Sequence, residues 1–258
     1  MLRKKISILR IIVLVSVFTL INFNPLFSEE VVIIKEGNVL LKEIDRNLSP
    51  ESFESLRKII NIEPNGRKKE FVLFALKKGN EKMVTTFLAP KSEIGRSTLR
   101  LGDNMWLYIP NIGKPMRITS LQSVIGGIFN NSDIMQLDYS VEYNVVKMNE
   151  ESDGKILILK AKTRNVAYDQ LKMWVELKHK TPSKIECYTT SGMLIKTLRF
   201  SKIKDFKKGV IRPTVLETDS PLHKGYKSVM LYAKISPRKI DDEIFTLNYM
   251  SKIKDMRN

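Results

Sequence analysis

Turn signals recur along the chain at intervals too short for intervening helices, and this spacing constrains the fold more than any other feature. Gly79-Asn80, Gly102-Asp103, Asp153-Gly154, Ser191-Gly192 and Lys208-Gly209 each separate two runs with the composition of strands. Residues of these types accept the backbone angles of tight hairpin turns. Because parallel strands need long crossover connections, connections this short predict antiparallel strands that follow one another. The sequence therefore predicts one strongly curved antiparallel sheet.

The predicted strands cover most of the chain beyond residue 68. They are Lys69–Lys77, Lys82–Leu88, Ser97–Leu101, Met105–Ile109, Tyr139–Met148, Lys155–Lys162, Leu171–Leu177, Lys184–Thr189, Leu194–Phe206, Val210–Thr218 and Lys227–Ile235. Within Phe71–Leu76, Met105–Ile109 and Ile156–Leu159, apolar residues occupy consecutive rather than alternate positions. A sheet with one face in water would alternate, so both faces of these strands should be covered or should line an apolar space. The predicted fold is mainly β with short α, an incomplete half-open barrel closed by short helices.

Three short helices are predicted to close this sheet. Asn38–Leu48 places Leu40, Leu41, Ile44 and Leu48 at helical spacing, so one face of that helix needs an apolar surface. Ser49-Pro50-Glu51 is a helix-start signal and predicts a second, short helix before the strand-like Leu56–Ile62. A single helical turn is expected over Asp133–Leu137, capped by Asn131 or Ser132.

The N-terminus has the features of a secretory signal peptide. Arg3, Lys4, Lys5 and Arg10 precede an apolar run from Ile11 to Ile21, and the small Ser28 precedes Glu29. The run is shorter than the roughly 18 residues expected of a membrane span, although an uncleaved anchor is the alternative. We therefore expect a signal peptide over residues 1–28, cleaved near Ser28-Glu29, and a single domain over residues 29–258.

Basic residues exceed acidic ones, and the surplus survives removal of the signal peptide. The whole chain has 44 basic and 28 acidic residues. Taking away the four basic residues of 1–28 leaves 40 against 28, a surplus of 12. An exported chain is not expected to meet nucleic acid, so the surplus indicates a solvated face or attraction to anionic lipid headgroups. Cys187, with no partner cysteine, is expected to be a small buried hydrophobic residue.

The residues that carry out most enzymatic chemistry are sparse. The two histidines, His179 and His223, lie in polar, loop-like surroundings. The sequence contains no Gly-x-Ser-x-Gly elbow, no phosphate-cradling glycine loop and no His/Cys/Asp cluster at metal-ligand spacing. We expect neither catalysis nor a cofactor or metal, and Asp133 is interpreted as a helix-start acid.

Aromatic and methionine side chains are concentrated in the predicted strands. Such side chains suit a surface that accepts flexible acyl chains, because they repack without leaving voids, although packing of an ordinary core explains each one singly. Trp106 and Tyr108 share one strand face and are the strongest candidates for a cavity wall. The full set of cavity candidates is Phe71, Leu73, Met105, Trp106, Tyr108, Met173 and Trp174.

The order of residues from Gly95 to Tyr143 resembles the outer-membrane lipoprotein-sorting proteins, relatives of the lipoprotein carrier LolA, in the branch associated with ABC or RND-type exporters. The matching positions are Leu99, Arg100, Gly102, Asp103, Trp106, Tyr108, Pro110, Arg117, Ile118, Gly126, Phe129, Asn131, Asp133 and Asp138. Further matches are Ala167-Tyr168, Met173-Trp174-Val175, Pro182, Ser191-Gly192, Lys196-Thr197 and Ile244-Phe245-Thr246. The resemblance spans roughly Asn38 to Met250, and it departs from many members at Gly127-Ile128.

The resemblance implies a periplasmic carrier, soluble or peripherally membrane-associated, that binds acyl chains of lipoproteins or another lipid and moves them toward the outer membrane. An inner-membrane ABC or RND-type transporter would load it, and an outer-membrane acceptor is a further expected partner. The lid would be the N-terminal helix and the Gly113–Asp138 segment; its lid and hinge candidates are Leu40, Ile44, Gly126, Gly127, Phe129 and Asp133. Arg57, Arg100 and Arg117 are all candidates for an arginine that locks it. A non-lipid-binding accessory module of an exporter is the alternative function.

Overall fold

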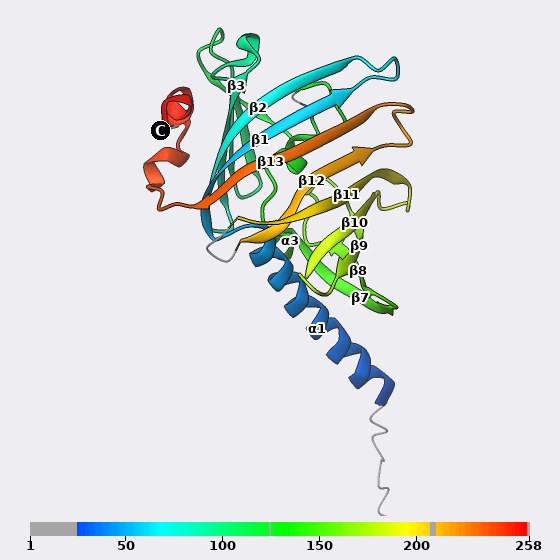
Figure 1. Cartoon of the computed structure of the whole chain (residues 1–258). Helices are drawn as coiled ribbons and strands as arrows, with labels where there is room; N and C mark the ends of the chain where they lie inside the picture. The colour runs from blue at the N-terminus through cyan, green and yellow to red at the C-terminus, as the bar shows by residue number, and fades with distance from the viewer. Residues whose placement is uncertain (1–24, 124, 207–209, 257–258) are drawn as a thin grey trace, which may run out of the picture.

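The computed structural model describes residues 25–123, 125–206 and 210–256. Thirteen strands form one antiparallel sheet in the order β6-β5-β4-β3-β2-β1-β13-β12-β11-β10-β9-β8-β7. Strands that are neighbours in the sheet are also consecutive along the chain, except at the centre, where β1 pairs with β13. Figure 1 shows the strands curving around an interior, which confirms the predicted curved and unclosed antiparallel sheet.

The strand bounds agree closely with the expected ranges in most places. They are β1 Ser52–Ile62, β2 Lys68–Lys78, β3 Lys82–Ala89, β4 Ser97–Leu101, β5 Asn104–Tyr108, β6 Pro115–Ile118, β7 Tyr143–Glu151, β8 Gly154–Ala161, β9 Gln170–Glu176, β10 Thr181–Tyr188, β11 Leu194–Asp205, β12 Ile211–Asp219 and β13 Lys227–Pro237. The helices are α1 Pro25–Leu48, α2 Asn131–Ile134 and α3 Tyr139–Glu142. Short 3₁₀ helices cover Lys91–Glu93, Asp242–Phe245 and Leu247–Met256.

The N-terminal helix is longer than predicted, and the second predicted helix is wrong. Helix α1 ends at Leu48, and strand β1 begins at Ser52, where a helix was expected to follow Ser49-Pro50-Glu51. Strand β1 is central and pairs with both β2 and β13 along its length, so tertiary pairing overrides the local start signal. The predicted cleavage site at Ser28-Glu29 lies within α1, and the preceding residues of the predicted signal peptide up to residue 24 lie outside the described residues.

Two further local predictions need correction around the middle of the chain. Residues Tyr139–Glu142 form helix α3 instead of the beginning of a strand, and β7 begins at Tyr143. Helix α2 is capped by Asn130, one residue before the earliest expected cap. Asn130 Oδ1 accepts from the Asp133 amide at 3.1 Å while the Asn130 amide donates to Asp133 Oδ2 at 3.0 Å, a reciprocal capping box.

Apolar side chains form two separate clusters, one on each face of the sheet. Strand β2 contributes Phe71, Leu73 and Ala75 to the inner cluster and Phe74 and Leu76 to the outer one. The C-terminal segment covers the outer face of β3, β4 and β5 with Ile240, Ile244, Phe245, Met250 and Ile253. Figure 1 shows this segment beside β3, far from α1. Both faces of β2 are therefore covered, as expected, but the C-terminal cover was not predicted.

Helix α1 lies near the other edge of the sheet and extends beyond it (Figure 1). Asn38 Oδ1 accepts a hydrogen bond from the Val145 amide of β7 at 3.1 Å. A side chain at Gly37 would meet Val145 Cγ1 at 2.7 Å, so glycine allows the helix to approach this strand. Among the described residues, none of the helices is long and apolar enough to cross a membrane.

Candidate functional site

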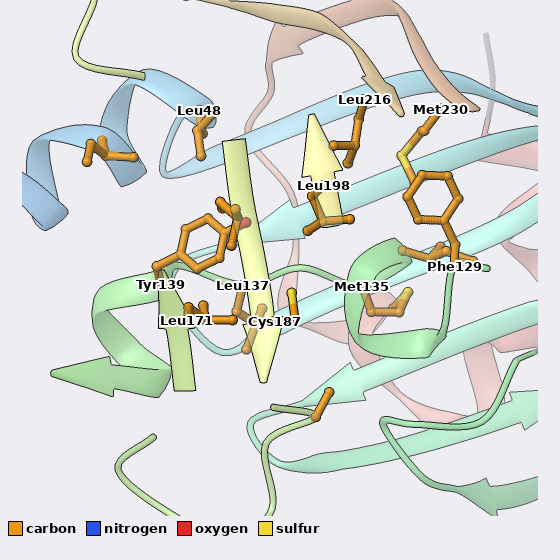
Figure 2. Close-up of a cluster of buried hydrophobic side chains, with 14 of the residues drawn as sticks. Leu48, Phe129, Met135, Leu137, Tyr139, Leu171, Cys187, Leu198, Leu216 and Met230 are labelled. Atoms are coloured by element: carbon orange, nitrogen blue, oxygen red, sulfur yellow. The ribbon is translucent and has the colours of Figure 1, made fainter. Parts of the chain in front are cut away.

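The interior of the curved sheet is filled by residues 119–123 and 125–142, here called the plug. Its apolar side chains, Ile125, Phe129, Ile134, Met135, Leu137 and Tyr139, are buried in the inner cluster together with side chains from both halves of the sheet. Figure 2 shows Phe129 beside Met230, with Met135 next to Phe129. The concave face is therefore apolar and already occupied by a segment of the same chain.

Within the plug, backbone hydrogen bonds run between its own residues. The Asn131 amide donates to Gln122 O, the Ser132 amide to Ser120 O and the Met135 amide to Asn131 O. Its contacts with the strands are instead made by side chains: Asn61 Nδ2 donates to Ile125 O at 3.0 Å, and Ser228 Oγ accepts from the Ile128 amide at 3.0 Å. Each of these side-chain hydrogen bonds can break independently of the others. A strand, by contrast, separates from its neighbour in the sheet only when many backbone hydrogen bonds break together.

Two of the three candidate arginines hold the plug, and the third does not. Arg57 Nη1 donates to Ile134 O at 2.9 Å, and Arg100 Nη1 donates to Met135 O at 3.1 Å. Arg100 also forms a buried ion pair with Glu142, which belongs to the plug. Arg117 lies at an exposed position and donates to Asn104. Arg57 and Arg100 thus restrain the plug from two different strands, β1 and β4.

A buried ion pair anchors the start of helix α2. Lys196 Nζ donates to Asp133 Oδ2 and to Ile128 O, both at 2.7 Å. Tyr168 Oη donates to Asp133 Oδ1 at 2.9 Å, so both carboxylate oxygens are occupied. Burial raises the pKa of Tyr168 well above its usual value, and the Asp133 charge raises this pKa further, which keeps the donating hydroxyl protonated. Asp133 is therefore more than the helix-start acid that the sequence indicates.

Helix α1 is joined to the plug by the Asp45 carboxylate. Its two oxygens accept from the amides of Tyr139 at 2.7 Å and Ser140 at 2.9 Å, at the start of α3. Burial raises the pKa of Asp45 to about 6, against hydrogen bonds that favour its charged form. Leu40, Leu41, Ile44 and Leu48 of α1 lie in the inner cluster, so the helix covers one side of the plug.

A small cavity remains between the end of α1, the plug and four strands. It measures about 50 Å³ and is lined, among others, by Arg57, Arg212, Tyr232, Leu198 and Leu216. The share of liquid volume per water molecule is about 30 Å³, so this space holds only one or two waters. An acyl chain can enter this interior only if the plug moves.

The predicted cavity candidates divide between the two faces of the sheet. Phe71, Leu73, Met105 and Met173 belong to the inner cluster. Trp106 and Tyr108 pack against the outer cluster under the C-terminal segment, and so the expectation that they line an inner cavity is corrected. Trp174 alternates with Met173 and lies on the other face, with the Lys184 Nζ at 3.4 Å and the Lys172 Nζ at 4.6 Å from its ring centroid.

The predicted lid and hinge residues largely come together. Leu40, Ile44 and Phe129 meet in the inner cluster, and Asp133 is buried beside them. Gly126 has a φ of +66°, which favours glycine. At Gly127 a Cβ would lie 2.1 Å from Asn61 Oδ1, so this glycine allows close packing of the plug on β1. The hinge role of the pair stays a prediction.

Several polar residues of this site were missed from the sequence. Asp45, Arg212 and Tyr232 all line the cavity. In strand β1 the inner positions also include Ser55 and Asn61, which by composition resemble solvent positions. The hydrogen-bond partners of these side chains include carbonyl and hydroxyl groups, and some of them lie far away along the chain. A local sequence pattern does not reveal such partners.

Comparisons with known proteins identify the fold. Residues 79–252 match the model of a family described as an uncharacterized protein. A LolA superfamily protein from Nitrosomonas europaea is 28% identical, with a TM-score of 0.74, over 83% of this chain and 98% of its own. An outer membrane lipoprotein-sorting protein domain from Vibrio parahaemolyticus shares 18% identity and a TM-score of 0.69, over 84% of this chain and 99% of its own.

A DUF1329 family protein from Desulfovibrio piger shares 19% identity and a TM-score of 0.73, over 84% of this chain and 99% of its own. No curated protein matches the sequence. The family match covers more than half of the chain, and the structural matches cover 83% to 84% of it. The chain therefore belongs to the family described as an uncharacterized protein, and it has the fold of the LolA superfamily of outer-membrane lipoprotein-sorting proteins.

Proposed function

We propose that this protein is a periplasmic carrier that binds the acyl chains of a lipoprotein or another lipid inside the curved sheet. The cargo would be received from an inner-membrane ABC or RND-type transporter and moved toward the outer membrane. The proposed function makes and breaks no covalent bond. The likeness to the LolA superfamily protein and to the lipoprotein-sorting domain supports this reading, and the interior of the sheet supplies the physical argument.

One observation carries the proposal: an apolar interior is filled by a segment that is held to the sheet through side chains. The inner faces of β2, β5 and β9 present Phe71, Leu73, Met105 and Met173 to the plug. If the plug leaves, these side chains need another apolar partner. Burial of an acyl chain contributes about 0.8 kcal/mol of favourable free energy for each methylene. A chain of ordinary length therefore offsets the loss of the plug's apolar contacts by on the order of 10 kcal/mol.

Loading is therefore an exchange of one apolar occupant for another. The contacts to be broken are hydrogen bonds to plug carbonyls and ion pairs with plug carboxylates. The hydrogen bonds come from Asn61, Arg57, Arg100 and Lys196, and the ion pairs join Arg100 to Glu142, Lys196 to Asp133 and Lys77 to Asp138. A hydrogen bond to a charged group contributes about 1.5–3 kcal/mol, so these restraints oppose the gain from acyl burial and favour release of the cargo.

The filled interior also favours a second candidate function. A cavity of about 50 Å³ accommodates no lipid, as expected of a non-lipid-binding accessory module of an exporter. Such a module would keep the plug in place permanently. The two functions differ in whether displacement of the plug increases binding of an acyl ligand.

Two matched variants test the carrier function. Phe129 of the plug and Phe245 of the C-terminal segment are both phenylalanines buried from solvent, one in each cluster. Truncation of a buried Phe to Ala costs about 3–5 kcal/mol. Phe129→Ala weakens the plugged state specifically, so we expect tighter binding of a fluorescent monoacylglycerol, about tenfold or more, because the competent population rises. Phe245→Ala should lower the urea midpoint and leave that affinity unchanged.

The measurement is a fluorescence titration of the purified protein, with circular dichroism to show that each variant is folded. Binding by the wild type that tightens only in Phe129→Ala supports a carrier. Failure of wild type and Phe129→Ala alike to bind the probe, while both stay folded, would exclude the carrier and favour the accessory module.

A further inference from the structure

Two buried arginines face the same cavity, and both lie close to the ring of one tyrosine. Arg57 of β1 and Arg212 of β12 are only 4% and 5% exposed. The Arg57 Cζ lies 4.9 Å from the Tyr232 ring centroid, and the Arg212 Cζ lies 3.9 Å from it. All three side chains line the cavity at the end of α1.

These two guanidinium groups differ from the other buried cations in the kind of partner they have. Among the described residues, Lys196 pairs with Asp133, Arg100 with Glu142 and Lys77 with Asp138. Arg57 donates to Ser55 Oγ and Ile134 O, and Arg212 donates to Pro213 O and Leu48 O. Arg212 also forms a side-chain hydrogen bond with Tyr232; burial acts to raise the pKa of that tyrosine, but the charges of both arginines lower it overall. None of these partners is a carboxylate. A buried charge without an opposite charge is costly, so the pair is a strong attractor for an anion.

The charges around the cavity leave a positive surplus. Asp45, Asp133 and Asp138 also line it, but Asp133 and Asp138 are neutralised by Lys196 and Lys77. Two arginines then face the single carboxylate of Asp45, which already accepts two backbone amides. One elementary positive charge therefore remains when Asp45 is ionised, and two remain when it is protonated.

The carbonyls that hold the arginines belong to the two movable covers of the interior. Ile134 lies in the plug, and Leu48 is the last residue of α1. When the plug and the end of α1 move away, both guanidinium groups lose an acceptor at the same time. Phosphate and carboxylate oxygens replace carbonyl oxygens with advantage, because they carry the charge opposite to guanidinium and can accept two parallel hydrogen bonds from its fork of donors.

We infer that the cargo is an anionic amphiphile whose phosphate or carboxylate headgroup binds between Arg57 and Arg212. This inference rests on the proposed carrier function and specifies its substrate class. Leu137, Leu198 and Leu216 lie next to the arginines and continue the apolar surface, so an acyl chain attached to the headgroup would run into the interior (Figure 2). The anion would also favour the open state, since it takes the place of the carbonyls that keep the covers closed.

Two ligands with the same acyl chain separate headgroup from chain. Dodecanoate is anionic, and its glycerol monoester is neutral; both are measured by displacement of the fluorescent monoacylglycerol. We expect the wild type to bind dodecanoate about tenfold more tightly or better, a difference of about 1.4 kcal/mol. Arg212→Met should remove this preference and keep the affinity for the monoester.

Arg199→Met is the matched control. Arg199 lies on the neighbouring strand β11, where its side chain is exposed and paired with Asp219, so its loss should leave the preference intact. Arg57→Met is the second variant should Arg212→Met fail to fold, and the wild-type preference itself needs no variant. Inorganic phosphate is added as a competitor: displacement of dodecanoate shows that a free anion suffices, and no displacement with preference kept shows that the headgroup must belong to a lipid.

The outcomes distinguish this inference from the function on which it rests. Equal affinity of the wild type for dodecanoate and the monoester overturns the headgroup site and leaves the carrier function standing. If both Arg57→Met and Arg212→Met still bind dodecanoate more tightly than the monoester, other residues cause this preference, and the inference is likewise overturned. If neither ligand binds, the carrier function fails and this inference fails with it.

Discussion

Asp45 illustrates how one buried carboxylate couples separate parts of this protein. It projects from α1 and accepts hydrogen bonds from the first two amides of α3, so it adds a restraint on the plug to those made by Arg57 and Arg100. Burial raises its pKa to about 6, above the usual value near 3.8. A group whose pKa is higher in the folded state stabilises the fold at low pH, and this stabilisation is lost as the pH rises through the folded pKa.

We expect Asp45→Asn to remove a pH-dependent part of the stability. Between pH 5 and 7 the wild type should lose about 1 kcal/mol from this group, because its proton is released from a buried site. The variant keeps an oxygen acceptor and has no proton to lose. Urea unfolding of both proteins at several pH values in that window gives the free energy of unfolding of each. The contributions of all other titrating groups are the same in both proteins, so they cancel in the difference between the two free energies. A difference independent of pH would contradict the raised pKa.

At the scale of elements, strand β5 shows how alternation assigns neighbours to different surroundings. Met105 lies in the inner cluster against the plug, whereas Trp106 packs in the outer cluster beneath the C-terminal segment. Both were candidates for the cavity wall, since both are large and apolar. Successive side chains of a strand point to opposite faces, so only one of them can face the interior.

Paired substitutions on this strand separate the two faces. Met105→Asp should weaken binding of the fluorescent monoacylglycerol tenfold or more, about 1.4 kcal/mol or above, because an unpaired carboxylate enters the apolar interior. Trp106→Asp should leave that affinity within about twofold and lower the urea midpoint, since it disturbs only the C-terminal cover. Equilibrium titration and urea unfolding are measured on both variants. Loss of affinity in Trp106→Asp alone would reverse the assignment of the faces.

At the scale of the whole molecule, the first and last strands of the chain pair at the centre of the sheet. Strand β1 pairs with β13 from Phe53↔Pro237 to Ile62↔Lys227, and it pairs with β2 on its other side. These two strands therefore have neighbours on both edges, and their amides open only when much of the sheet unfolds. The plug is different, since its bonds to the sheet are made by single side chains.

Native-state hydrogen exchange should reveal the plug as a separate unit. The plug residues should exchange through local opening, with a free energy several kcal/mol below that of β1 and β13, because no strand ladder must break. Hydrogen exchange of the unliganded protein, followed by mass spectrometry in low concentrations of urea, measures the opening free energies of the plug and of the two strands. Exchange of the plug only through global unfolding would show that it is a fixed part of the core, as the accessory-module function requires.

Local features of the sequence predicted the strands well and the polar centre of the site poorly. The hairpins around Gly79, Gly102 and Gly192 follow from glycine's tolerance of positive φ, and each of these residues has a φ between 55° and 81°. Helix α1 was predicted from the spacing of Leu40, Leu41 and Ile44, which lie in the inner cluster. By contrast, the start of β1 was misread as a helix, because its identity depends on partners at residues 68–78 and 227–237.

The sequence by itself determined the antiparallel order of strands, the cover on both faces of the central strands, and an amphipathic helix that ends at Leu48, since turn chemistry and hydrophobic spacing act over a few residues. Only the tertiary structure decided which face of each strand is concave, that Asn130 caps α2, and that Arg57 and Arg212 meet around Tyr232. Those outcomes depend on which distant segments pack together. Arg57 and Arg212 are 155 positions apart, and their meeting follows from the pairing of both their strands with β13.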